Sequence, residues 1–160
     1  MAKSKSSLSV LQLSTMVVLR LATGWLLLYE GIGRVMYSNF SLSGYLAGSK
    51  GFLSGYFKSL AAQPGLMQTL NFVNEWGLII IGLGLIFGLL VKFFSLSGMI
   101  FVLIGYLSHP PFMGLSYTSM VQGRYLVVDE LFICFFLLAV FILFPTSHLI
   151  GIDRMIFGKK

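Results

Sequence analysis

Four of the five acidic residues in this sequence stand near the ends of long apolar runs, where carboxylates could accept and release protons. Arginine and histidine residues lie close to them along the chain. Carboxylates and imidazoles in partly dry surroundings suit proton transfer, and guanidinium groups donate hydrogen bonds to anions and carbonyl oxygens. The set comprises Glu30, Glu75, Asp129 and Glu130, together with Arg34, Arg124 and His109.

The first long apolar run places two arginines and two glycines on one side of a predicted helix. At about 100° per residue, Arg20, Gly24, Gly31 and Arg34 project within one narrow arc. Glu30 lies at the edge of that arc, four residues before Arg34, which is the spacing of a helical ion pair. This pair is either a simple interfacial ion pair or part of a binding site. Arg20 either extends to the lipid headgroups or pairs across the helix bundle.

The second apolar run carries glycines on two faces. Glu75 and Gly82 share one face, and Gly77, Gly84 and Gly88 line the opposite one. The spacing Gly84-x-x-x-Gly88 is typical of membrane helices that approach each other closely. We therefore interpret the glycines as packing residues.

The remaining candidates lie around the third and fourth apolar runs. His109 precedes Pro110 and Pro111, so it either ends a helix or handles protons. Glu130 and Cys134 share a face of the last predicted helix. Cys134 is most simply a small apolar core residue, because a lone cysteine forms no internal disulfide, and no Cys/His spacing predicts a metal or haem site.

The elements that must position these groups are membrane helices. The chain has 160 residues, of which 57% are hydrophobic and 10% are charged, whereas a soluble domain of this length carries about forty charged residues. A domain this small buries only about 70% of its unfolded surface, so much apolar sequence would face water. The composition excludes disorder, a disulfide scaffold and an ordinary cytosolic enzyme, and it predicts an integral membrane protein.

We predict a single all-α domain over residues 1–160, formed by a bundle of four transmembrane helices. A span needs about 20 mostly apolar residues. The predicted spans are residues 15–36, 72–91, 94–107 and 126–144.

The first loop is long and rich in glycine and aromatic residues. Gly44, Gly48, Gly51 and Gly55 recur at helical spacing and would form a stripe if the segment were helical. An interfacial helix, with or without a chemical role, and a re-entrant helix are both consistent with this pattern.

The distribution of basic residues predicts the topology. The two tails and the hairpin at Lys92 carry more lysine and arginine than the first and third loops do. The chain is therefore predicted to be a multi-pass protein of the cytoplasmic (inner) membrane, with both termini cytoplasmic and the first and third loops extracytoplasmic. This topology predicts that the acidic, arginine and histidine side chains named above gather in a polar site at the outer end of the bundle.

The N-terminal apolar run contains Arg20 and has no small-residue cleavage site, so we interpret it as a retained span. The net charge is +6, and its basic residues mostly flank apolar runs. We therefore expect them to set the orientation of the chain in the lipid bilayer and not to bind nucleic acid.

The run "LRLATGWLLLYEGIGRV" resembles the opening motif of the DoxX/DoxD family, which are small four-helix membrane proteins. The residues that carry the likeness are Arg20, Gly24, Gly31 and Arg34, then Glu75, Gly82, Gly88 and Lys92, and finally Gly151 and Asp153. Arg34 stands where lysine is commoner, and Glu30 occupies a usually apolar position. The glycine-rich first loop and "YLSHPPF" are more similar to the DoxD branch, whose subunits in thiosulfate:quinone oxidoreductase oxidise thiosulfate and reduce a membrane quinone.

The resemblance implies a membrane subunit of a quinone-linked oxidoreductase, with the thiosulfate:quinone type as one candidate and quinone as co-substrate. The sequence itself contains no ligand pattern that predicts a metal, a haem or a flavin. Glu75, Glu130 and His109 would transfer protons, and Arg34, Glu30, Arg20, Arg124 and Asp129 would bind the substrate or the quinone. The alternative is a non-enzymatic module that binds a partner protein, a lipid or a small ligand. A second membrane or periplasmic subunit, or a homo-oligomer, is compatible with either hypothesis.

Overall fold

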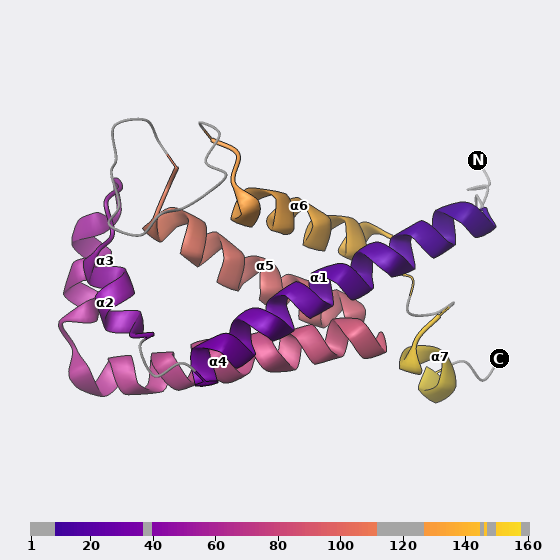
Figure 1. Ribbon diagram of the computed structural model, residues 1–160, viewed down its shortest axis with the longest axis horizontal. Helices are drawn as coiled ribbons and strands as arrows, with labels where there is room; N and C mark the ends of the chain where they lie inside the picture. The colour runs from indigo at the N-terminus through magenta and orange to yellow at the C-terminus, as the bar shows by residue number, and fades with distance from the viewer. Residues whose placement is uncertain (1–8, 37–39, 112–126, 145, 147–149, 158–160) are drawn as a thin grey trace, which may run out of the picture.

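The computed structural model describes residues 9–36, 40–111, 127–144, 146 and 150–157. Every regular element within these ranges is a helix (Figure 1). The helices are α1 (Val10–Met36), α2 (Leu42–Ala47), α3 (Ser54–Ala61), α4 (Pro64–Phe87), α5 (Val91–Ser108), α6 (Glu130–Leu143) and α7 (Ile152–Phe157).

Three of these helices, α1, α4 and α5, are long and apolar enough to cross a membrane. In their most apolar windows only 22–28% of the residues are buried inside the protein. Many of their apolar side chains are therefore exposed or half-buried, as expected of helices surrounded by lipid. α6 is also apolar but has only 14 residues.

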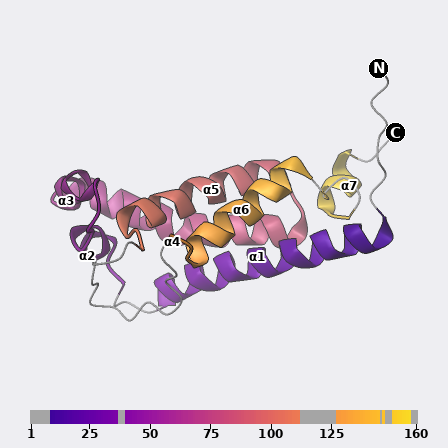
Figure 2. The same cartoon turned by 90° about the horizontal axis from the view of Figure 1, so that it is seen from above.

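The long helices run along a common axis, as Figure 2 shows. α1 packs chiefly on α4, and α6 packs chiefly on α5, while α4 and α5 join the two pairs. Contacts between α1 and α6 are much sparser. The buried core between the helices includes Leu85, Val91, Leu138 and Phe141.

The glycines of α4 allow close packing against two different helices, α1 and α5. A side chain at Gly82 would meet the backbone of α1, with a Cβ only 2.6 Å from the Leu28 nitrogen. Gly77 and Gly84 instead face Phe101 and Phe94 of α5. The prediction that the glycine faces mediate packing is confirmed. However, Gly84-x-x-x-Gly88 is not a continuous crossing motif.

Gly84-x-x-x-Gly88 does not act as one crossing motif because Gly88 ends α4. Gly88 adopts φ 66°, and its N–H bonds to carbonyls of the last turn of α4. Leu90 follows with φ 41°, a left-handed conformation that is unfavourable for a leucine. The Asp153 side chain accepts a hydrogen bond from the Leu90 N–H at 2.9 Å, which holds this turn against the start of α7.

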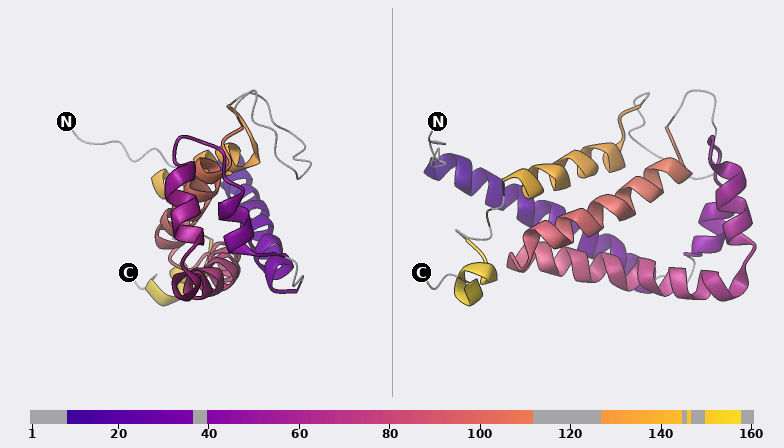
Figure 3. Two further views of the ribbon diagram at one scale, coloured as in Figure 1. Left: turned by 90° about the vertical axis from the view of Figure 1, so that its left-hand side faces the viewer. Right: turned by 180° about the vertical axis from the view of Figure 1, so that it is seen from behind.

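The first loop is shorter than predicted and contains two helices. α4 begins at Pro64, eight residues before the expected start, with the proline in its first turn, where its missing N–H costs nothing. α2 and α3 lie across one end of the bundle (Figure 3). The break between them at residues 48–53 means that the four glycines do not form one stripe.

α2 and α3 have a small core of their own. It consists of Leu42, Leu46, Phe57 and Met67, with Tyr45 and Leu107 packed against it. Ser41 caps α2 by accepting a hydrogen bond from the Gly44 N–H. We refer to this side of the molecule as the α2–α3 end, and to the opposite side, where α1 begins and α7 lies, as the terminal end.

Candidate functional site

The seam between α1 and α4 positions the two arginines of α1. Gly24 lies against Gly82 and Ile86, and Gly31 lies against Leu78 and Ile79, so the two backbones run close together. Arg20 and Arg34 extend the same face at its two ends. This arrangement confirms the narrow arc predicted from the helical repeat.

Arg34 is held at the α2–α3 end by contacts with three residues. Its Nη2 donates to the Glu30 Oε1 at 2.9 Å, and its Nε donates to the same oxygen at 3.3 Å. Its Nη1 donates to the Asn74 Oδ1 of α4. The guanidinium carbon also lies 4.7 Å from the centre of the Phe40 ring, within the range of a cation–π contact. The predicted ion pair with Glu30 is therefore present, and it is tied to a second helix.

A cavity of about 390 Å³ opens beside this group, and we call it the inner cavity. Its polar side chains are Glu30, Arg34, Asn74, Tyr45 and Glu130. The rest of the wall is mostly apolar and includes Leu26, Leu78, Phe101, Val102, Leu131 and Cys134. An apolar cavity with a few convergent polar groups is the usual form of a small-molecule site.

A second hollow lies between α1 and α6, where contacts between the helices are sparse. This lateral groove has a volume of about 450 Å³ and is lined mainly by apolar side chains of the two helices. Asp129 and Glu130 stand at one end of it. Leu26, Glu130 and Cys134 line both the groove and the inner cavity, so these side chains form a shared wall.

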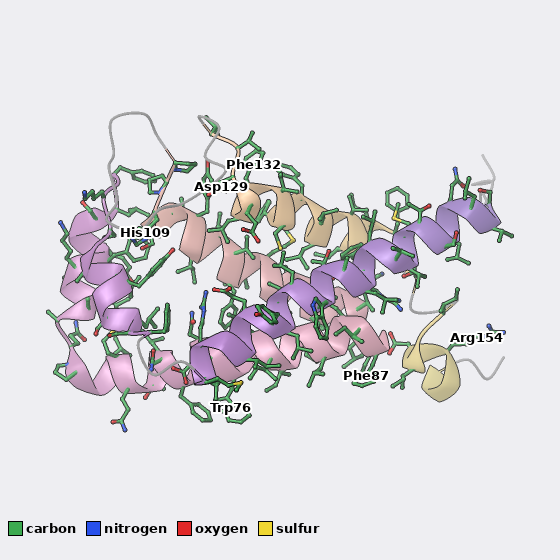
Figure 4. The ribbon with its side chains drawn as sticks, in the orientation of Figure 1. Trp76, Phe87, His109, Asp129, Phe132 and Arg154 are labelled. Carbon is green, nitrogen blue, oxygen red and sulfur yellow. The ribbon has the colours of Figure 1, made fainter. Side chains whose placement is uncertain are left out.

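The two acidic residues at the start of α6 have different roles. Asp129 is the N-cap, and its carboxylate accepts a hydrogen bond from the Phe132 N–H at 2.8 Å (Figure 4). Aspartate is one of the preferred residues at the N-cap because its carboxylate accepts hydrogen bonds from the first turn of the helix. Glu130 is exposed and lines both hollows, so its carboxylate is available to a ligand. The Tyr106 hydroxyl donates to the Val127 carbonyl and holds this segment against α5.

Glu75 does not line the inner cavity. Because α4 begins at Pro64, Glu75 lies inside that helix and not at its start. Its Oε1 accepts a hydrogen bond from Asn71 at 2.9 Å, and the Asn71 amide oxygen accepts one from the Leu42 N–H at 3.4 Å. Glu75 therefore helps to fix the start of α2 against α4.

His109 also lies at this end but outside the cavity wall (Figure 4). It follows the last residue of α5, and its Nδ1 is 3.0 Å from the Ser108 hydroxyl. Its ring packs against Tyr45 with the ring centres 4.0 Å apart. Tyr45 lines the cavity, so the contact between the two rings places His109 directly behind the cavity wall.

Arg20 lies at the opposite end of the seam, about 21 Å along α1 from Arg34. It is 2% exposed, and its Nη1 donates to the Thr146 hydroxyl at 2.9 Å and to the Ile150 carbonyl at 3.0 Å. The Asp153 carboxylate adds electrostatic attraction. The structure thus separates Arg20 from both hollows and gives it partners across the bundle. Arg124 lies outside the described residues.

Sequence reasoning missed two residues that shape the cavity. Asn74 binds Arg34, and Tyr45 connects the cavity to His109. The signal for Asn74 was its position one residue before Glu75 on a helix that faces α1. Within the described ranges, no three His, Cys, Asp or Glu side chains gather closely enough to hold a metal ion.

These features define the class of the protein: a multi-pass helical membrane protein with a mostly apolar cavity that carries a few polar side chains near one end of its bundle. The DoxX family model matches residues 15–110, which is more than half of the chain. The chain therefore belongs to the DoxX family. No curated protein and no solved structure gives a significant match.

Proposed function

We propose that this protein is the quinone-binding membrane subunit of an oxidoreductase, and that the quinone ring binds in the inner cavity. The observation that supports this most strongly is the position of the donors of Arg34 and Asn74 on the wall of a mostly apolar cavity. A quinone has the matching chemistry, because its ring is flat and apolar and its two carbonyl oxygens accept hydrogen bonds.

Arg34 retains donors for such a ligand. A guanidinium has five N–H groups, and the contacts with Glu30 and Asn74 among the described residues use three of them. Two N–H groups on the Nη atoms are left for a carbonyl oxygen. The contacts with Glu30, Asn74 and Phe40 fix the plane of the guanidinium, which reduces the cost of ordering it when a ligand binds.

The carboxylates supply a route for protons. A quinone takes up two electrons and two protons when it becomes a quinol. Glu30 is 57% exposed and touches Arg34, while Glu130 is exposed and lines the cavity from the opposite helix. Carboxylates that contact both solvent and a ligand site are suited to carry these protons. In this proposal Glu75, Asp129 and His109 position the site, and Arg20 stabilises the terminal end.

The family resemblance suggests thiosulfate as the electron donor. Two thiosulfate ions would join through a new sulfur–sulfur bond and release two electrons, which equals the number that one quinone accepts. We propose thiosulfate as the first donor to test, with a second subunit as the alternative source of electrons.

The proposal includes a membrane topology. α6 would be the fourth span, although its 14 residues extend only about 21 Å along a bilayer core of about 30 Å. An even number of spans places both termini on one side, and the excess of basic residues in the tails and the α4–α5 turn favours the cytoplasm. Cysteine accessibility in inner-membrane vesicles, with single cysteines at Ser4 and Ser59 in a Cys134→Ser background, tests this orientation.

The function is tested with purified protein in lipid nanodiscs. A benzoquinone with a decyl tail should bind with saturation above the level of empty nanodiscs, and thiosulfate should reduce it. Arg34→Gln should weaken binding, whereas the matched variant Arg154→Gln, on α7 at the other end, should leave it unchanged. An absence of saturable binding by the wild-type protein would overturn the proposal.

A non-enzymatic module that binds a partner protein is the second candidate. The specific observation in its favour is the layer formed by α2 and α3, on which Phe52 and Tyr56 are largely exposed. A stoichiometric partner that co-purifies in mild detergent and is lost on Phe52→Ser, in a protein that binds no quinone, would favour this alternative.

A further inference from the structure

We infer that the lateral groove between α1 and α6 binds the hydrocarbon tail of the ligand whose ring occupies the inner cavity. This inference rests on the proposed function and adds a chemical requirement to it. The ligand would be an amphiphile with a long apolar tail that reaches the site from within the bilayer.

The position of the groove supports this assignment. It lies between α1 and α6, whose mutual contacts are sparse compared with those of α1 on α4 and of α6 on α5. It is lined by Leu19, Ala22, Thr23, Leu26, Ile133 and Leu137 from the facing sides of these two helices. Ala22 and Ile133 are exposed, so in a membrane lipid chains reach the groove directly. An unbranched or prenyl chain offers only apolar contacts, and the middle of the groove offers almost nothing else.

The connection to the inner cavity gives the second argument. Leu26, Glu130 and Cys134 line both hollows, so a molecule could extend from one to the other by displacing few side chains. Glu130 is exposed in the first turn of α6, so its side chain can change rotamer without moving the packed core. A ring beside Arg34 and a tail between α1 and α6 would then meet at Glu130.

The polar groups are arranged in the order that an amphiphile requires. Arg34 and Asn74 lie in the inner cavity, the carboxylate of Glu130 lies at the shared wall, and the groove beyond it is apolar. Thr23 is the one hydroxyl-bearing side chain in this wall, and its Oγ1 already donates to the Leu19 carbonyl. A tail in the groove would therefore leave the Thr23 hydroxyl with its partner.

The experiment compares two benzoquinones with the same ring, one carrying a decyl tail and one without a tail. Equilibrium binding is measured with wild-type protein, Ala22→Phe and Leu21→Phe in lipid nanodiscs. Ala22→Phe fills the groove, whereas Leu21→Phe adds a ring to a neighbouring exposed position that lines neither hollow. We expect Ala22→Phe to weaken binding of the tailed quinone about tenfold or more and to change binding of the tailless quinone by less than about twofold.

The other outcomes separate the two proposals. If Ala22→Phe weakens both quinones equally, or weakens neither, the groove does not hold the tail, and the proposed function stands. If wild-type protein binds neither quinone, the proposed function fails, and the tail assignment fails with it.

A second measurement needs no substitution and so does not depend on the folding of a variant. A tailed quinone with a diazirine near the end of the tail is irradiated with the wild-type protein, and the adducts are located by mass spectrometry. Adducts at residues 19–26 of α1 and 133–137 of α6 are expected. Adducts confined to the lipid-facing sides of α4 and α5 would overturn the inference.

Discussion

Arg20 and Arg34 lie on the same face of the same helix, yet the two ends of the bundle use them differently. Arg20 is 2% exposed and is enclosed by Thr146, the Ile150 carbonyl and the nearby Asp153 carboxylate. The side chain of Arg34 is 22% exposed and stands on the wall of a cavity. The difference comes from what covers each end, because Thr146 and Ile150 enclose Arg20, whereas α2 and α3 leave a cavity beside Arg34.

The comparison indicates how one helix can serve stability at one end and binding at the other. A buried arginine with fixed partners holds distant segments together and offers little to a ligand. An arginine held by one carboxylate and one amide keeps both its orientation and some of its donors. We therefore expect substitutions at the terminal end to change stability, and substitutions at the α2–α3 end to change ligand binding.

The largest effect is expected from Arg20→Gln. Removing one member of a buried charged cluster costs about 3 kcal/mol or more, because the hydrogen bonds to Thr146 and Ile150 are lost and Asp153 loses its nearby cation. Unfolding by SDS in mixed micelles measures this change. The same substitution at Arg34 is the matched comparison and should cost less than about 1 kcal/mol, because that pair is partly exposed. Equal losses at the two positions would contradict the distinction.

The next largest effect is expected from Gly82→Ala. Its added Cβ would lie 2.6 Å from the Leu28 nitrogen and 2.7 Å from the Gly24 carbonyl, so α1 and α4 must move apart. Overpacking of this kind costs about 1–3 kcal/mol, and the shift should also disturb Arg34 and Asn74. Gly33→Ala is the control on α1, because a Cβ there meets nothing within 4 Å. A fully stable Gly82→Ala protein would show that the close seam is not required.

A smaller effect is expected for Arg34→Gln in ligand binding. Loss of a charged donor should weaken binding of the tailless benzoquinone by about tenfold, equivalent to about 1.4 kcal/mol, with little change in stability. Equilibrium binding in nanodiscs measures it, and Arg20→Lys is a suitable control because it keeps a cation at the terminal end. If Arg20→Lys weakened binding as strongly as Arg34→Gln, the separation of the two ends would be wrong.

The smallest effect is expected from Glu30→Gln. The glutamine oxygen can still accept from Arg34, so stability should change by about 0.5 kcal/mol or less, and binding should change by less than about twofold. SDS unfolding and quinone titration of the same preparation test both statements. A tenfold loss of binding would instead make Glu30 the principal ligand group.

The sequence predicted the features that depend on helical periodicity. The arc of Arg20, Gly24, Gly31 and Arg34 follows from the repeat of a single helix, and so does the pair formed by Glu30 and Arg34. Both are present because α1 is regular over its whole length. The membrane class followed equally well from composition.

Features that depend on contacts between segments could not be predicted. The partners of Arg20 lie more than a hundred residues away, at Thr146 and Ile150. Asn74 carries no charge, so its position beside Glu75 was the one signal in the sequence, and that position did not identify Arg34 as its partner. Glu75 was expected at the mouth of a span, but hydropathy does not detect the early start of α4 at Pro64, because residues 64–71 are only partly apolar.

The central claim is that Arg34 donates a hydrogen bond to the ring carbonyl of a quinone in the inner cavity. Infrared difference spectroscopy of a benzoquinone with ¹³C-labelled carbonyls tests this contact directly in nanodiscs. The account predicts that one labelled carbonyl band moves to lower frequency with the wild-type protein and returns towards its position in lipid with Arg34→Gln. A band that stays at its lipid position with wild-type protein, or that moves equally with Arg34→Gln, would contradict the account.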